Sequence, residues 1–185
     1  MDADRVREIQ KQLEDERFSR YTRASAYYAF LFALGLSALV SSFLLYNGLK
    51  QSQSFVELGM VIGFVTLMFL TIALYSSVAR NFRKNWVGKV VNKRKYKRIK
   101  NNHVVIVYEV DIEKENGQLH VLSYENSDVL YNYYHKDEPV YYAGLYNSVI
   151  KLSRDQDSFH PCVACATLNT NHQDVCHRCG CPLIR

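Results

Sequence analysis

Two long stretches of this sequence contain no charged residue. Residues 24–49 and 58–79 have no Asp, Glu, Lys, Arg or His. Both are longer than the roughly 20 residues that an apolar helix needs to cross the hydrocarbon core of a bilayer. Proton relays and ion paths need ionisable side chains near the middle of the membrane, and these stretches lack them. The sequence therefore indicates membrane spans and argues against a transporter or a pump.

Patterns of catalytic residues are also lacking. The sequence has no glycine-rich phosphate loop, and no Ser or Cys nucleophile has an identifiable base. The histidines between residues 103 and 135 are scattered, and the acids between residues 109 and 113 alternate along one expected strand. Neither group completes a catalytic site. We therefore expect a binding protein rather than an enzyme.

The two uncharged stretches predict a hairpin of membrane helices over residues 24–79. The loop between them is short and polar, so the helices are expected to be antiparallel neighbours. Small residues at four-residue spacing let helix backbones approach closely. The residues concerned are Ala33, Ser37, Gly59 and Gly63. Packing of the two spans on each other is the simpler interpretation, and a homodimer through Gly59 and Gly63 is the sharper alternative.

Basic residues at the ends of the hairpin predict its orientation. Arg17, Arg20 and Arg23 precede the first span and several Arg and Lys follow the second, whereas the connecting loop has only Lys50. Short loops rich in Lys and Arg stay cytoplasmic. Both termini are therefore expected to face the cytoplasm. Residues 1–23, which mix acids and bases around a thin apolar stripe, predict a charged N-terminal helix that leads into the first span.

Residues 80–100 form a basic juxtamembrane segment that leads into the first expected strand. They contain ten Lys or Arg and no acid. Hairpin orientation explains part of this excess, and the phosphate groups of lipids or of nucleic acid would bind the rest. Because the segment emerges at the bilayer, we expect contact with anionic lipid headgroups rather than nucleic acid. The residues expected there are Arg80, Arg83, Lys84, Lys89, Lys93, Arg94, Lys95, Lys97 and Arg98.

Residues 86–153 predict a small antiparallel β-domain. Apolar and acidic residues alternate over 103–113, which indicates a strand with one wet face, and Asn116-Gly117 is a strong hairpin signal. A two-residue turn there would place Ile112 opposite Val121. Further strands are expected at 87–92, 140–143 and 148–152, with 128–135 open between helix and strand. Such short strands favour a partial barrel, with a core filled by the tyrosines of residues 124–146.

All five cysteines fall in the last 24 residues, after a polar linker over 154–161. Cytoplasmic thiols stay reduced, which favours a metal site over disulfides. Two Cys-x-x-Cys pairs, Cys162/Cys165 and Cys176/Cys179, can supply four thiolates in a tetrahedron around one zinc ion. Cys181 could replace Cys179, and a histidine could enter the shell. The histidines near the cysteines are His160, His172 and His177.

The segment 162–185 resembles the zinc ribbons, in which two knuckles clamp one zinc ion. The second knuckle of that family usually reads Cys-x-x-Cys-Gly followed by an apolar residue, and Cys176, Cys179, Gly180 and Leu183 match it. The first knuckle departs from the pattern because Ala166 stands where glycine is common. The resemblance implies a metal and a fold but no activity. The layout of hairpin, β-domain and ribbon also looks like that of many bacterial membrane proteins, which favours a bacterial plasma membrane over the endoplasmic reticulum.

Four cysteines would fill the coordination of zinc and leave no position for water, so the zinc is expected to be structural. A rigid ribbon beside a membrane is suited to recognition. We therefore expect an integral membrane adaptor or assembly factor that presents its β-domain and ribbon to a partner protein. The alternative is a membrane-associated sensor of metal, redox state or lipid charge.

Overall fold

The computed structural model describes residues 3–50, 54–153 and 157–184. The chain forms two compact units. One unit contains the residues up to Phe18 together with those from Arg83 onward, and the other spans Ser19–Phe82. The loop residues 51–53 and part of the expected linker, residues 154–156, lie outside the described residues.

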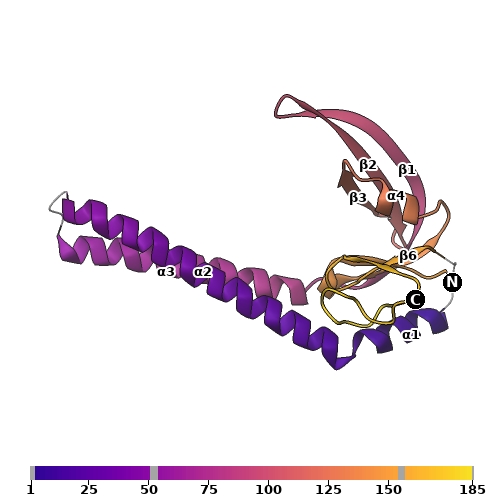
Figure 1. Ribbon diagram of the computed structural model, residues 1–185, viewed down its shortest axis with the longest axis horizontal. Helices are drawn as coiled ribbons and strands as arrows, with labels where there is room; N and C mark the ends of the chain where they lie inside the picture. The colour runs from indigo at the N-terminus through magenta and orange to yellow at the C-terminus, as the bar shows by residue number, and fades with distance from the viewer. Residues whose placement is uncertain (1–2, 51–53, 154–156, 185) are drawn as a thin grey trace. The chain divides into compact units, whose positions relative to one another are not determined.

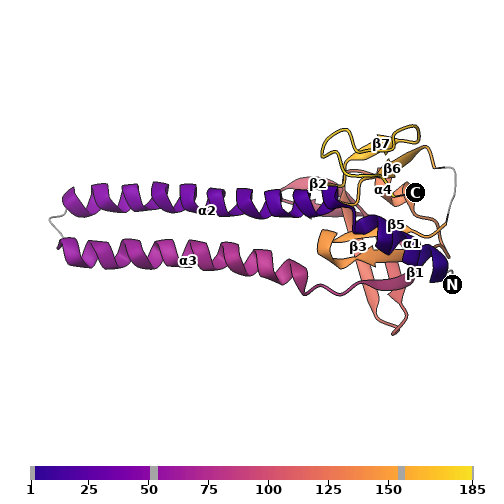
Figure 2. The ribbon, with the colours of Figure 1, turned by 90° about the horizontal axis from the view of Figure 1, so that it is seen from below.

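The unit Ser19–Phe82 is a pair of antiparallel helices, α2 (Glu16–Lys50) and α3 (Phe55–Asn81) (Figure 2). Both helices are long and apolar enough to cross a membrane, and large side chains such as Phe43 and Phe64 are about 69% exposed. Contacts between the helices are polar as well as apolar: the Ser37 hydroxyl donates to Thr66 Oγ1 over 3.0 Å. The helical hairpin expected from the sequence is therefore present.

The small residues expected at the helix contact differ in their positions. Ala33 and Ser37 are buried, at 7% and 3% exposure. Gly59 and Gly63 are exposed, and a β-carbon added to either would meet no other atom within 4 Å. The glycines therefore lie outside the α2–α3 contact and leave a smooth face on α3.

Residues 3–23 do not form a single helix. Helix α1 (Ala3–Leu13) ends before a turn at Glu14–Asp15, and α2 begins at Glu16. Asp15 stops one helix and caps the next, because its side chain accepts a hydrogen bond from the backbone N–H of Arg17 over 2.8 Å. Ile9 and Phe18 are fully buried in the unit that contains the β-domain.

The β-domain is a five-stranded antiparallel sheet with the strand order β3-β2-β1-β4-β5. Figure 1 labels three of its strands, β1, β2 and β3. The sheet is open, with β3 and β5 at its edges, so the expected partial barrel does not close. A short helix resolves the ambiguous segment 128–135. The elements are β1 (Trp86–Lys100), β2 (His103–Lys114), β3 (Leu119–Glu125), α4 (Val129–Tyr133), β4 (Pro139–Ala143), the 3-10 turn η1 (Gly144–Tyr146) and β5 (Ser148–Lys151).

The turn between β2 and β3 has three residues, not two. Lys114 N–H donates to Gln118 O, and Gly117 N–H donates to Lys114 O, both over 2.9 Å. Gly117 adopts a φ of +78°, which glycine tolerates without strain. The extra residue shifts the pairing by one position, so Ile112 lies opposite His120. The register predicted from the sequence, with Ile112 opposite Val121, is therefore wrong.

The core of the β-domain lies on one face of the sheet, beneath α4. It combines aliphatic residues of the central strands with aromatic residues, as predicted for this tyrosine-rich region. Tyr141 points to the other face, where it lines a small cavity with Gln10 and Leu13 of α1. The buried members of the core are Val90, Val110, Ile112, Tyr133, Tyr134, Val140, Tyr142 and Val149.

Candidate metal centre

The C-terminal cysteines are carried by two matching turns beside a small antiparallel sheet, β6 (Phe159–Pro161) and β7 (Leu168–Thr170). In the first turn, Ala166 N–H donates to Cys162 O over 2.8 Å, and in the second, Gly180 N–H donates to Cys176 O over 2.9 Å. Ala166 and Gly180 both adopt a positive φ, of +57° and +69°. The two knuckles therefore share one backbone geometry, although only one has the glycine that suits it.

The structure brings together the four cysteines predicted from their spacing. The sulfur atoms of Cys162, Cys165, Cys176 and Cys179 all lie within 4.8 Å of one another. Cys162 and Cys179 are 3.5 Å apart, and Cys165 and Cys176 are 3.6 Å apart, both far longer than a disulfide bond of about 2.05 Å. A zinc ion with bonds of about 2.3 Å to four sulfurs would separate them by about 3.8 Å. The cluster therefore has the size of a site for one metal ion.

Among the four cysteines, hydrogen bonds favour the charged sulfur at Cys176, whereas burial raises the pKa of Cys179 in the same knuckle. Burial raises the pKa of Cys162 to about 12. Burial acts in the same direction on Cys176, but hydrogen bonds from the backbone of Cys179 and Arg178, together with those from neighbouring cysteine side chains, outweigh it and lower the pKa of Cys176 to about 6. A divalent cation would replace the remaining protons, because only the thiolate binds metal.

Asn169 is a supporting residue that the sequence analysis missed. Its side-chain oxygen accepts a hydrogen bond from the backbone N–H of His177, and its amide donates to Thr167 O over 2.7 Å. Asn169 is 3% exposed, so these bonds are shielded from water. It links the strand after the first knuckle to the second knuckle. Its position between two cysteine pairs is the one signal that could have indicated this role.

Cys181 and the nearby histidines lie outside the four-sulfur cluster. Cys181 is fully buried, and its sulfur is 3.7 Å from the backbone oxygen of Arg17, in the first turn of α2. The ring of His177 contacts Asn169 Oδ1 at 2.9 Å. Cys181 therefore packs the ribbon against the N-terminal segment.

The basic residues of 80–100 are distributed over the last turn of α3, the connecting segment and β1, and many have partners. Arg94 forms ion pairs with Glu109 and Asp111, and Lys89 pairs with Asp137. Lys93 and Lys95 lie over tyrosine rings, and the Arg80 guanidinium donates to Ser25. Among the basic residues of 80–100, those whose side chains have no hydrogen bond, ion pair or ring contact with the described residues are Arg83, Lys84, Lys97 and Arg98.

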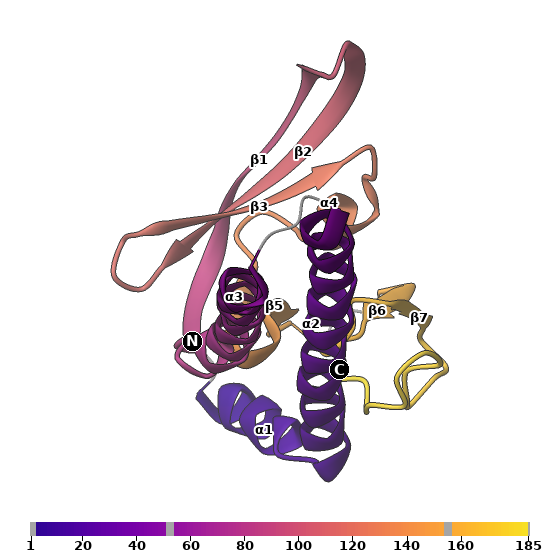
Figure 3. The same ribbon diagram turned by 90° about the vertical axis from the view of Figure 1, so that its left-hand side faces the viewer.

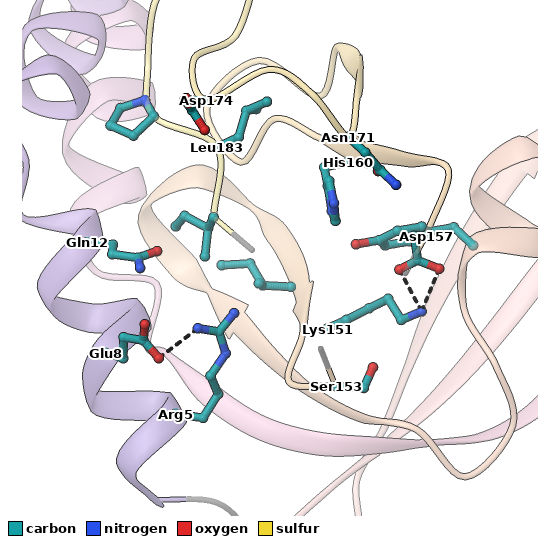
Figure 4. Close-up of a pocket in the computed structure, with 14 residues that line it drawn as sticks. Arg5, Glu8, Gln12, Lys151, Ser153, Asp157, His160, Asn171, Asp174 and Leu183 are labelled. Carbon is teal, nitrogen blue, oxygen red and sulfur yellow. Dashed lines mark hydrogen bonds and ion pairs between the residues drawn. The ribbon is translucent and has the colours of Figure 1, made fainter. Parts of the chain in front are cut away.

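A polar cleft of about 730 Å³ lies between α1, β5 and the ribbon (Figure 4). Lys151 is buried at its wall, with its Nζ 2.8 Å from Glu138 and 3.0 Å from Asp157. Burial alone would lower the pKa of Lys151, but the two carboxylates raise it above its ordinary value. The cations and anions around Lys151 offset one another, so the cleft does not select a ligand of one charge.

No protein-family model, no curated protein and no solved structure matches this chain. The best-defined group is the four-cysteine cluster, which can hold one metal ion and is built from two similar turns.

Proposed function

We propose that this protein is an integral membrane adaptor that presents its β-domain and a zinc ribbon to a partner protein at the cytoplasmic surface. The observation that carries the proposal is the closed set of four sulfur atoms. Four thiolates fill the coordination of zinc, so the ion would have no open position for substrate or water. Such a site stabilises a surface instead of performing chemistry.

Zinc is the metal that suits this donor set best. Four cysteine sulfurs at tetrahedral spacing are typical of structural zinc sites, and zinc needs no redox partner. Cys162, Cys165, Cys176 and Cys179 would hold the ion. Because the ribbon has only short strands and a few buried apolar residues, its folding would depend on that ion.

The composition of the compact units supports both termini lying on one side of the membrane. The unit that contains α1 also contains the β-domain and the ribbon, although two long apolar helices separate them in sequence. Two spans return the chain to the side from which it started. The Lys and Arg residues at the ends of the hairpin then favour the cytoplasm for that side.

Anionic lipid is the second contact that we propose. Arg83 and Lys84 follow α3 by two or three residues and have no ion pair with the described residues. Each Lys or Arg close to an anionic surface contributes about 1 kcal/mol. The burial of Cys181 makes a redox sensor the weaker alternative, because sensor cysteines must be accessible.

Co-purification from the native membrane tests the adaptor function. Wild-type protein, a Cys162→Ser/Cys165→Ser variant and a Cys181→Ser variant would be cross-linked and isolated in parallel. We expect wild type and Cys181→Ser to recover the same protein and the double variant to lose it, since only the double variant loses metal. Recovery that is equal in all three, with metal absent from the double variant, would show that the ribbon is not needed for recognition.

A further inference from the structure

Strand β1 is much longer than β4, the strand that pairs with the edge of β1 opposite β2. It pairs with β2 from Gly88 to Lys100, but β4 pairs with it only from Trp86 to Lys89. Two further hydrogen bonds join Val90 to the segment before β4. Among the described residues, no strand pairs with the side of Lys93–Lys100 that faces away from β2, and β1 and β2 extend beyond β3 as an arm (Figure 3).

The hydrogen bonds of β2 show which peptide groups of β1 point to this open edge. Ile106 N–H donates to Asn126 Oδ1, and Ile106 O accepts from Asn126 N–H, so both groups of Ile106 point away from β1. Lys97 lies opposite Ile106, so its own N–H and C=O point away from β2. By the alternation of an antiparallel ladder, those of Lys95 and Ile99 do the same.

The residues that present these peptide groups also carry positive charge. Successive side chains alternate between faces, so Lys93, Lys95 and Lys97 share one face of the arm. On the opposite face, Arg94 pairs with Glu109 and Lys100 pairs with Glu125, whereas Arg98 has no ion pair with the described residues. The charge that remains unmatched therefore includes that of Lys97 at the open edge.

We propose that the open edge of β1 binds an extended acidic segment of a partner protein as a sixth strand of the sheet. This inference rests on the proposed recognition function and specifies the partner's chemistry. Residues 93–99 span about 23 Å, enough for a strand of about seven residues. Acidic side chains at alternate positions would lie beside Lys95 and Lys97, on the face that also carries Ile99, which is 76% exposed.

The charges of the edge favour this occupant over a second copy of the chain. Two copies of β1 paired edge to edge would place lysines beside lysines, which destabilises the pair. Lysines on edge strands are a common protection against such self-pairing. An acidic strand would convert the same lysines into partners. Anionic lipids could bind the charges but would not use the backbone groups of the edge.

A synthetic peptide of about eight alternating Glu and Val residues is the probe. The intact, isotopically labelled protein would be held in nanodiscs of neutral lipid, and backbone amide signals would be followed during titration. We expect shifts confined to Lys93–Lys100 and slowed hydrogen exchange at Lys95, Lys97 and Ile99. The same peptide with N-methyl groups on the amides that face β1 keeps its charge but cannot pair, so it should not bind.

Two substitutions at one position separate hydrogen bonding from charge. Lys97→Gln and Lys97→Pro remove the same charge, but only proline removes the outward N–H. A proline there leaves the bonds to β2 in place, which unchanged amide signals of Val105 and Val107 would verify. We expect binding to weaken about threefold with Gln and about tenfold or more with Pro. The methylated peptide gives the same comparison on wild-type protein if the proline variant does not fold.

Three results would overturn the edge proposal. They are equal binding of the plain and the N-methylated peptide, an equal loss of affinity in Lys97→Gln and Lys97→Pro, and no binding of the peptide at all. Displacement of the peptide by anionic vesicles, together with equal loss in the two variants, would assign the arm to lipid. Self-association that Lys97→Pro abolishes, without peptide binding, would assign it to a second copy. None of these results would alter recovery of a partner through the zinc ribbon, so failure of the edge can be told from failure of the adaptor function.

Discussion

The side-chain oxygen of Asn169 accepts a hydrogen bond from the backbone N–H of His177 over 3.1 Å. This contact joins β7, the strand after the first knuckle, to the second knuckle at a point that no metal ligand occupies. We predict that Asn169→Ala lowers zinc affinity about 10- to 100-fold, as loss of groups that orient metal ligands commonly does. Competition with a chromophoric chelator would measure the affinity. Asn171→Ala is the control, because the oxygen of Asn171 has no hydrogen-bond partner among the described residues; equal effects of both would contradict the prediction.

Zinc affinity should change in opposite directions when alanine is replaced by glycine in the first knuckle and glycine by alanine in the second. Ala166 has a φ of +57°, which costs a residue with a β-carbon about 1 kcal/mol. Ala166→Gly should relieve this strain and tighten zinc binding about twofold to fivefold, since folding and binding are coupled. Gly180→Ala should weaken binding by a similar factor, because a β-carbon there meets no other atom and adds only backbone strain. A change of the same sign in both variants would refute this account.

Removal of the buried cation Lys151 should destabilise the β-domain. Its side chain and that of Glu138 are 2% and 4% exposed, so Lys151→Met leaves a buried carboxylate without its partner. We expect a loss of about 3–5 kcal/mol in the free energy of unfolding. The single tryptophan, Trp86, packs against the core and reports unfolding by fluorescence.

The matched control is Lys89→Met, which removes an exposed ion pair with Asp137. No measurable change is expected there, because water and salt screen such pairs. A second change, Glu138→Gln, should recover part of the stability lost in Lys151→Met. Equal losses of unfolding free energy in Lys151→Met and Lys89→Met would show that burial does not determine how much an ion pair stabilises the domain.

The β-domain should lose stability between about pH 10 and pH 12. Burial raises the pKa of Tyr124 to about 12 and raises that of Tyr134 well above its ordinary value. An unfolded chain releases tyrosine protons near pH 10, so in this window the unfolded state binds fewer protons and becomes favoured. The stabilisation is complete below that window. The free energy of unfolding, measured by Trp86 fluorescence, should fall less steeply with pH in Tyr124→Phe than in the wild type. Identical slopes in the two proteins would contradict the assignment.

The exposed glycines of α3 allow a test of homodimer formation. If Gly59 and Gly63 form a contact between copies, Gly63→Leu should reduce the dimer about tenfold while leaving the Ser37–Thr66 contact unchanged. Energy transfer between labelled copies in bilayers would measure the dimer. Gly35→Leu is the matched control, because Gly35 on α2 is equally free of neighbouring atoms. The same dimer fraction in wild type and Gly63→Leu would exclude this face.

Features set by neighbouring residues could be predicted from the sequence. The Cys-x-x-Cys spacing brings two sulfurs to one turn, so the four members of the cluster were predicted correctly. The long apolar runs that form α2 and α3 were equally clear. In contrast, the break at Asp15 depends on a single capping side chain within a charged run, and the sequence analysis expected one helix there.

Features set by distant residues could not be predicted in the same way. The strand expected over residues 87–92 continues to Lys100, because β2 supplies pairing partners that offset the weak strand preference of lysines. Because the turn contains one extra residue, Glu115, Ile112 pairs with His120 and not with Val121, the partner expected from the sequence. The open edge of β1 arises because β4 stops pairing at Lys89, and no local pattern indicates where a neighbouring strand will end.

The packing of Cys181 beside Arg17 sets an order of events during biosynthesis. The sulfur of Cys181 reaches a backbone oxygen that leaves the ribosome more than a hundred residues earlier. This contact between the ribbon and the N-terminal segment can therefore form only after the end of the chain has been made. If α2 and α3 span a membrane as proposed, a chain that inserts only one of them would place these segments on opposite sides of that membrane. Completion of the domain would then act as a check on correct insertion, and quality-control proteases could recognise the chains that fail it.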